Sequence, residues 1–142
     1  MNISDSEQEI LVNDGHTLHL MWQENNDEVM YQTFDTVSAM ATSQVQNISN
    51  ASYSSSNPSL TLASNAIAIA FVDERSQGAQ PEIYGQIWLN GRAPRHGNLL
   101  ITEGQQAKLL WAFNQLYLAS VLHSDHYWYI DPRIPDHNSQ EL

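Results

Sequence analysis

The chain of 142 residues has no cysteine, few basic residues and no long apolar run. Without cysteine, disulfide bonds and thiolate metal sites are excluded. Five Lys and Arg stand against 16 acidic residues, so the chain lacks the clustered positive charge that nucleic acid binding needs. No segment is apolar enough to predict a membrane span, and MNISDSEQEI at the N-terminus does not resemble a signal peptide. We expect neither a nucleic acid partner nor a membrane span.

The sequence also lacks any amphipathic helical pattern longer than a turn or two. Instead, apolar and polar residues alternate with a period of two, in runs that end at turn residues, and such runs predict β-strands. The predicted strands are 9–13, 16–23, 28–34, 44–49, 58–63, 66–72, 82–89, 98–102, 107–113, 115–122 and 126–130. The predicted fold class is all-β.

These strands recur with a fixed period. Leu18, Ile67 and Leu116 follow one another at intervals of 49 residues, and the residues two positions further on repeat the interval. A fixed period marks a repeat architecture, and four antiparallel strands per unit are typical of a β-propeller blade. A single repeat domain is therefore predicted over 1–142, with blades at about 9–50, 57–104 and 106–131. The alternative is a β-sandwich, which would not require the recurrence.

The third predicted blade has no fourth strand of its own, because Pro132 and Pro135 interrupt the chain after it. ISDSEQEIL at 3–11 resembles ITEGQQAKL at 101–109, at twice the repeat interval. Residues 1–5 could therefore supply the missing outer strand, a closure that removes a free sheet edge. Three blades are too few to close a ring, so we expect a homodimer that forms one six-bladed ring. A fragment of a larger propeller is the alternative.

The second unit carries the clearest motif. Phe71-Val72-Asp73-Glu74-Arg75, followed by Glu82-Ile83-Tyr84-Gly85-Gln86, resembles a repeat of sialidase-like and bacterial surface β-propellers, in which aromatic-x-Asp-x-Arg leads to Asp/Glu-Ile-Tyr-x-Gln. The first unit keeps Trp22 and 28–32 without the Arg, and the third has Ser120 in the aromatic position. The resemblance implies a propeller fold, blade packing through these motifs, and an extracellular or cell-surface location.

The resemblance does not extend to sialidase chemistry. That family uses three arginines on the substrate carboxylate, a Tyr/Glu nucleophilic pair and an acidic Asp, whereas this chain has four arginines in all, with Arg92 and Arg95 in one turn. The Ser-x-Asp-x-Gly-x-x-Trp box is absent, as are the nucleophile elbow, P-loop and dinucleotide fingerprints. The sequence therefore predicts no catalytic residues.

Candidate ligand-binding residues lie in the loops that join second to third strands, because loops displayed by a rigid sheet commonly bind ligands. Polar hairpin loops also simply face water, which is the alternative interpretation. The candidates in these loops are Glu24, Asp27, Asp73, Glu74, Arg75, His123, Asp125 and His126. Tyr53 in the Ser-rich connection and Trp128 in the last predicted strand are added as exposed aromatic residues.

No metal or other cofactor is predicted. The segment 123–126 could offer two imidazoles and a carboxylate, but no third distant ligand is evident. Calcium on the acidic loops stays open, although the spacing of a calcium-binding loop is absent.

The aromatic inventory favours a carbohydrate ligand. Aromatic faces pack against the C–H surfaces of sugars while Asp, Asn and Arg bond the hydroxyls, and core packing is the alternative role for the same rings. Trp22 and Trp111 are assigned to the core, and Tyr53 and Trp128 to the surface. The functional hypothesis is a non-enzymatic, lectin-like binding module for a glycan or surface ligand. A scaffold for a basic partner and a propeller-type glycoside hydrolase or lyase are the alternatives.

Overall fold

The computed structural model describes residues 6–25, 27–75, 80–95, 97–121 and 128–131, and the side chains of most of these. Over this part of the chain all regular structure is β-strand, as predicted. None of the described segments forms a helix suited to crossing a membrane. The fold class is all-β.

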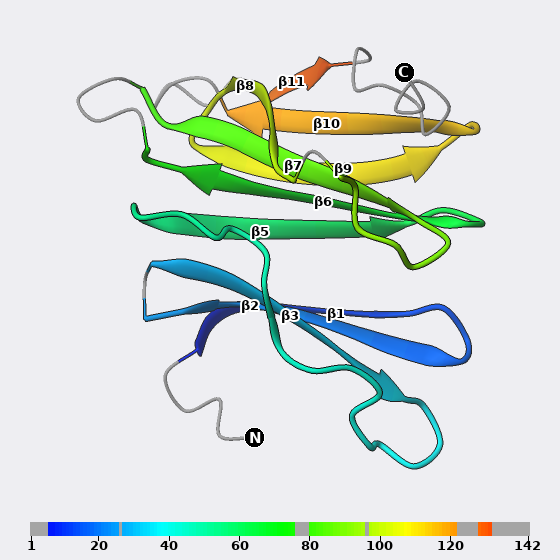
Figure 1. Cartoon of the computed structure of the whole chain (residues 1–142). Helices are drawn as coiled ribbons and strands as arrows, with labels where there is room; N and C mark the ends of the chain where they lie inside the picture. The colour runs from blue at the N-terminus through cyan, green and yellow to red at the C-terminus, as the bar shows by residue number, and fades with distance from the viewer. Residues whose placement is uncertain (1–5, 26, 76–79, 96, 122–127, 132–142) are drawn as a thin grey trace.

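The strands form three antiparallel sheets, each built from strands that are consecutive in sequence (Figure 1). The first sheet has the order β1-β2-β3-β4, the middle sheet β5-β6-β7-β8, and the third sheet β9-β10-β11. Their bounds are β1 Ser6–Asn13, β2 Thr17–Glu24, β3 Glu28–Asp35, β4 Gln46–Asn47, β5 Ser55–Leu62, β6 Ala66–Asp73, β7 Glu82–Leu89, β8 Leu99–Glu103, β9 Gln106–Ala112, β10 Gln115–Val121 and β11 Trp128–Asp131.

Most strand ends lie within two residues of their predicted positions, and β7 matches fully. The prediction of a strand over 44–49 was wrong in extent, because β4 comprises two residues. Beyond Asn47 the regular pairing ends, because the N–H groups of Ile48 and Ser49 both donate to the carbonyl oxygen of Val29, and their carbonyl oxygens accept from the Asn98 side chain. The predicted N-terminal strand at 1–5 lies outside the described residues.

Two other strands begin three residues earlier than predicted, because each contains a β-bulge that breaks the alternation. The bulge in β1 includes Gln8 with a φ of 53°, and the bulge in β5 includes Asn57 with a φ of 49°. Pro58 follows within the β5 bulge, where proline is tolerated because the ladder is already interrupted. Gln8 and Asn57 are 49 residues apart, so the bulge repeats with the sequence period.

The middle sheet buries both of its faces. One face packs against the first sheet, which contributes a buried face of alternate residues on β2 and β3. The buried members of this core are Met21, Val29, Tyr31, Ile48, Leu60, Ile69, Phe71 and Trp88. Figure 1 shows the first sheet, in blue, below the green strands of the middle sheet.

The opposite face of the middle sheet packs against the third sheet. On this face β6 presents Ala66, Ala68 and Ala70, whereas its largest residues face the first sheet. This second core contains Ala66, Ala68, Ala70, Val72, Ile83, Ile87, Ala107, Leu116 and Leu118. Trp111 is half-buried against it, and Trp22 is buried in the first sheet, so both tryptophans pack as predicted.

Gly85 of β7 lies close to the neighbouring strands of its own sheet. A Cβ at Gly85 would lie 2.6 Å from the carbonyl oxygen of Ile69 and 2.8 Å from Cδ1 of Ile101. Real Cβ atoms do not approach backbone so closely, so any larger residue at position 85 would require these strands to shift.

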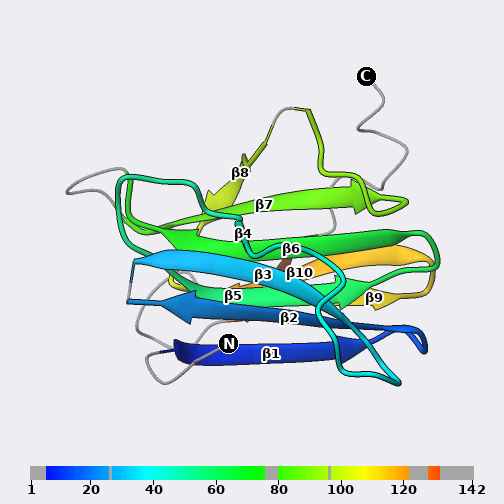
Figure 2. The same cartoon turned by 60° about the horizontal axis from the view of Figure 1, so that its bottom comes forward.

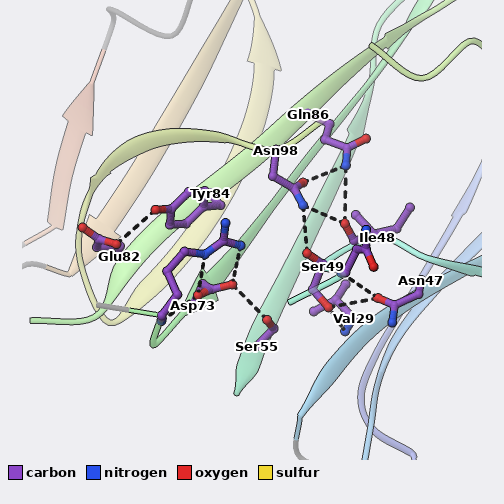
Figure 3. Close-up of polar contacts among 12 residues, drawn as sticks. Val29, Asn47, Ile48, Ser49, Ser55, Asp73, Glu82, Tyr84, Gln86 and Asn98 are labelled. Carbon is purple, nitrogen blue, oxygen red and sulfur yellow. Dashed lines mark hydrogen bonds and ion pairs between the residues drawn. The ribbon is translucent and has the colours of Figure 1, made fainter. Parts of the chain in front are cut away.

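Gln86, the last residue of the motif, links the first and middle sheets (Figure 3). Its Nε2 donates to Oδ1 of Asn98 at 2.7 Å, and Nδ2 of Asn98 donates to the carbonyl oxygens of Ile48 and Ser49 at 2.8 and 3.0 Å. Oγ of Ser49, in turn, accepts from the backbone N–H of Val29. Gln86 and Asn98 thus join the first and middle sheets through hydrogen bonds.

The first strands of the three sheets run in the same direction. The β1–β2, β5–β6 and β9–β10 turns therefore lie at one end of the molecule (Figures 1 and 2). The loops that follow β2 and β6 lie at the other end. We call these the hairpin end and the loop end.

Candidate functional site

A groove of about 620 Å³ opens between the first and middle sheets at the hairpin end. It is lined by residues of β2 to β7 and the adjoining turns. The lining residues are Asp14, His16, Thr17, His19, Tyr31, Thr33, Ser43, Gln46, Leu62, Ala63, Ser64, Asn65, Ala66, Ile67, Trp88, Asn90 and Gly91.

A chain of three side chains forms one wall of the groove. Asp14 Oδ2 lies 3.2 Å from Nε2 of His19, and Nδ1 of His19 lies 2.7 Å from the hydroxyl of Tyr31. A carboxylate can only accept, so Nε2–H donates to Asp14. In the neutral imidazole Nδ1 is then the acceptor, and Tyr31 donates its hydroxyl proton to it.

Local structure explains this arrangement. Asp14 follows the end of β1, and its Oδ1 accepts the backbone N–H groups of His16 and Thr17 at 2.9 and 2.7 Å, closing the β1–β2 turn. His19 and Tyr31 lie on β2 and β3, on the face that packs against the middle sheet. The turn and the sheet thus fix the three groups independently.

The environment shifts two pKa values in opposite directions. The backbone N–H groups of His16 and Thr17, together with the His19 side chain, lower the pKa of Asp14 to about 2. Burial, with a smaller effect from the charge of Asp14, raises the pKa of Tyr31 to about 12. At neutral pH Asp14 is a carboxylate and Tyr31 a neutral donor.

Burial restricts what this wall can do chemically. His19 is 5% exposed and Tyr31 1% exposed, whereas the Asp14 side chain is 41% exposed. A buried hydroxyl and imidazole that already satisfy each other are poorly placed to attack a substrate. The arrangement therefore holds the wall rigid and presents Asp14 to the groove as an acceptor.

Trp88 extends the aromatic floor from the middle sheet. Its ring meets that of Tyr31 edge-on, with centroids 5.1 Å apart, and its Nε1 donates to Oε1 of Gln86 at 2.7 Å. Trp88 therefore contacts Tyr31 of the first sheet and Gln86 of its own sheet.

The rim of the groove consists of neutral hydrogen-bonding groups. Exposed or half-buried Thr17, Ser43, Ser64, Asn65 and Asn90 surround the aromatic floor. The backbone N–H of Asn90 donates to the carbonyl oxygen of Asn65 at 2.9 Å, which joins two of the turns. Among the described lining residues Asp14 is the sole carboxylate, and no Lys or Arg is present.

The predicted Asp73–Arg75 turn lies at the loop end, away from this groove. Asp73 is fully buried and accepts from Nε and Nη2 of Arg75 at 2.9 and 2.7 Å and from Oγ of Ser55 at 3.2 Å (Figure 3). The guanidinium lies 3.8 Å from the ring centre of Tyr84, whose hydroxyl donates to Glu82. Asp73 also raises the pKa of Arg75. These partners tie β5, β6 and β7 together.

Four other predicted residues lie at the same loop end. Asp27, Glu74 and Tyr53 are exposed, and Glu24 is half-buried. The carbonyl of Asp27 accepts from the N–H of Ser55 at 2.9 Å, so the first-sheet loop adjoins the start of the middle sheet. Ligand binding by these residues stays a prediction.

The remaining candidates are not placed. His123, Asp125 and His126 lie outside the described residues, and so does the side chain of Trp128. Within the described part of the chain no three His, Asp or Glu side chains gather as a metal site would require.

Sequence reasoning missed Asp14, His19, Tyr31 and Trp88 as a group. The first lies in a turn and the others sit in strands, where alternation assigns them to packing. A histidine in the apolar run HTLHLMW was the available signal, since a buried imidazole needs partners.

Comparisons of this chain with protein families, curated proteins and solved structures found no match. Its function is therefore inferred from its own residues.

Proposed function

We propose that the protein is a non-enzymatic, lectin-like module that binds a sugar-like ligand in the groove of the hairpin end. The observation that carries the proposal is a groove with a rim of hydroxyl and carboxamide groups, above a base that is held rigid by the packing of Tyr31, 1% exposed, against Trp88, 5% exposed. Ligand sites are concave, largely apolar, and carry a few well-placed polar groups. Neutral donors and acceptors around an apolar floor match a polyhydroxylated, uncharged ligand.

The groove argues against glycoside hydrolysis. That chemistry requires two carboxyl groups on either side of the scissile bond. Asp14 is the one carboxylate among the described lining residues, and its low pKa suits an acceptor and not an acid. Binding without turnover is the function that these groups support.

The second candidate is a scaffold for a basic partner, favoured by the net charge of −11 and by exposed Asp27 and Glu74 at the loop end. Capture of immobilised polylysine that weakens with salt would support it. Capture that is insensitive to Asp27→Asn and Glu74→Gln would contradict it.

We further propose a propeller architecture in which each sheet is a blade. Support comes from the period of 49 residues, the repeated bulges, and the three meandering sheets that stack in sequence order. With three sheets in one chain, a second copy completes the ring.

A glycan array, followed by calorimetric titration of the strongest glycan, tests the ligand. Asn65→Ala removes a rim carboxamide and should weaken binding about tenfold, which corresponds to about one lost hydrogen bond. Glu74→Gln at the loop end is the matched control and should leave affinity unchanged.

Two results would contradict the groove as the site. One is an array without a hit for protein shown to be folded by circular dichroism. The other is affinity that falls with Glu74→Gln and not with Asn65→Ala, which would return the site to the loop end.

A further inference from the structure

The two outermost faces of the stacked sheets do not pack against another sheet of the described chain, although Trp22 on the outer face of the first sheet is 3% exposed. One is the face of the first sheet that points away from the middle sheet, here called the back face. The other is the far face of the third sheet, here called the front face. Each outer face has a residue pattern similar to that of one buried face of the middle sheet. The partner of that buried face therefore indicates what kind of surface would cover the outer face.

The back face of the first sheet reproduces the buried back face of the middle sheet. Leu11 pairs with Leu20 across β1 and β2, just as Leu60 pairs with Ile69 across β5 and β6, at the repeat interval. Six of the seven apolar positions on this face of the middle sheet have apolar counterparts in the first, and the seventh, Leu62, has Asn13 as its counterpart. The counterparts are Leu11 for Leu60, Leu18 for Ile67, Leu20 for Ile69, Trp22 for Phe71, Met30 for Tyr84, and Phe34 for Trp88.

Part of this back face is open to solvent. Leu11 is 62% exposed, although its counterpart Leu60 is 7% exposed in the core between the sheets. An apolar residue at a strand centre that is buried in one repeat and exposed in the next indicates a missing neighbour.

The front face of the third sheet is the complementary surface. Leu110 on β9 is 59% exposed and lies 49 residues after Thr61 of β5. Tyr117 and Ala119 on β10 share this face, and their counterparts Ala68 and Ala70 are buried against the third sheet. The middle sheet uses its front face to bind the next sheet, so the third sheet carries an unused copy of that surface.

The first strands converge on one pocket. Gln8, Asn57 and Gln106, at equal intervals of 49 residues, line a pocket of about 330 Å³ at the starts of β1, β5 and β9. Equivalent positions that meet at one point indicate sheets that are arranged around a common axis. Stacking can therefore continue around that axis with further sheets of the same kind.

We infer that the front face of the third sheet packs on the back face of the first sheet of a second copy, and the reverse, so that two chains close around this pocket. The contact is heterologous, front to back, and occurs twice in the pair. This inference rests on the ring proposed above and is independent of the ligand in the groove. A failed glycan array would leave it standing, and a monomeric protein would leave the groove intact.

The experiment compares three glutamate substitutions of exposed leucines. Leu11→Glu alters the back face and Leu110→Glu the front face. Leu100→Glu is the matched control, because Leu100 is 55% exposed on β8, the edge strand of the middle sheet. Circular dichroism verifies that each variant is folded, and light scattering gives the mass. We expect dimers for the parent and for Leu100→Glu. For Leu11→Glu and Leu110→Glu the association constant should fall at least about tenfold, because each dimer would bury unpaired glutamate charges.

Mixing the two face variants separates front-to-back packing from other dimers. A pair made of one Leu11→Glu chain and one Leu110→Glu chain keeps one intact contact. With one variant labelled with nitrogen-15, native mass spectrometry should show mixed dimers in excess of either pure dimer. A monomeric parent, dissociation caused by one face only, an absence of mixed dimers, or open chains larger than a dimer would each overturn the inference.

Discussion

At the residue scale, Asp14 connects the β1–β2 turn to the groove. It closes the turn through two backbone N–H groups and orients His19, which in turn fixes the hydroxyl of Tyr31. The same carboxylate is presented to the groove. One residue thus couples the stability of the turn to the geometry of the candidate site.

The lowered pKa of Asp14 gives a pH dependence with a definite sign. A carboxyl group whose pKa falls on folding stabilises the protein above its unfolded pKa, near 3.8, and loses this contribution as pH falls toward its folded pKa, about 2. Because the side chain is 41% exposed, we expect about 1 kcal/mol or less. Urea unfolding of Asp14→Asn should show a weaker loss of stability between pH 4 and pH 2 than the parent. An unchanged acid limb would contradict the assignment.

Gly85 tests the close approach of β7 to β6. Gly85→Ala should lower the free energy of unfolding by about 1–3 kcal/mol, because the new methyl group overlaps a backbone oxygen. Gly91→Ala is the control, since no atom lies within 4 Å of its Cβ position and the cost is limited to its φ of 73°. Equal effects of the two substitutions would mean that packing at Gly85 is loose.

At the element scale, alternation and turn residues were sufficient to predict the positions of most strands. β7 and β10 alternate cleanly between Gly, Asn or Pro boundaries, and both were found within one residue. The bulges at Gln8 and Asn57 were not predictable, because a bulge breaks the pattern on which the prediction depends. β4 was overestimated because the regular pairing ends at Ile48 and Ser49, whose N–H groups share one acceptor on Val29 and whose carbonyl oxygens bond Asn98, some 50 residues away.

The candidate site was less predictable than the strands. The acidic and aromatic loop residues were identifiable by type. In the structure, however, Asp73 accepts hydrogen bonds from Arg75 and Ser55 within the protein. The groove depends on which strands of two sheets come together, and that is a long-range property. Composition favoured a polar ligand but could not place it.

The Asp73–Arg75 pair predicts a stability effect that is separate from binding. Arg75→Ala leaves a fully buried carboxylate with only Ser55 and one backbone N–H as partners. We expect a loss of about 2–3 kcal/mol, below the range for wholly buried pairs because the arginine is 31% exposed. Chemical denaturation measures the loss, while glycan affinity of the folded variant should stay the same. A loss of affinity without a loss of stability would give the pair a binding role.

The β9–β10 turn carries a local strain that can be relieved. Phe113 and Asn114 form a two-residue turn with φ of 51° and 60°, and Phe113 is 94% exposed. A bulky residue is disfavoured in this conformation, so Phe113→Gly should raise stability by about 0.5–1 kcal/mol. Thermal unfolding measures the gain, and Asn114→Gly should give a smaller one because Asn tolerates this region. A destabilised Phe113→Gly would show that the ring makes a contact of its own.

At the scale of the whole molecule, the account depends on three sheets whose faces repeat. The middle sheet is buried on both sides, while the first and third each bury one face within the chain. The exposed Leu11 and Leu110 lie on the two faces left over. The groove lies between the first and middle sheets, within a single chain, so ligand binding and self-association can be measured separately.

The mass of the unmodified protein in solution is the most direct test of this architecture. The chain has a mass of 16.0 kDa, and two chains that close one ring predict a particle of twice that mass. Light scattering across a range of micromolar concentrations should report this dimer without larger species. A constant mass of 16.0 kDa for folded protein would contradict the ring.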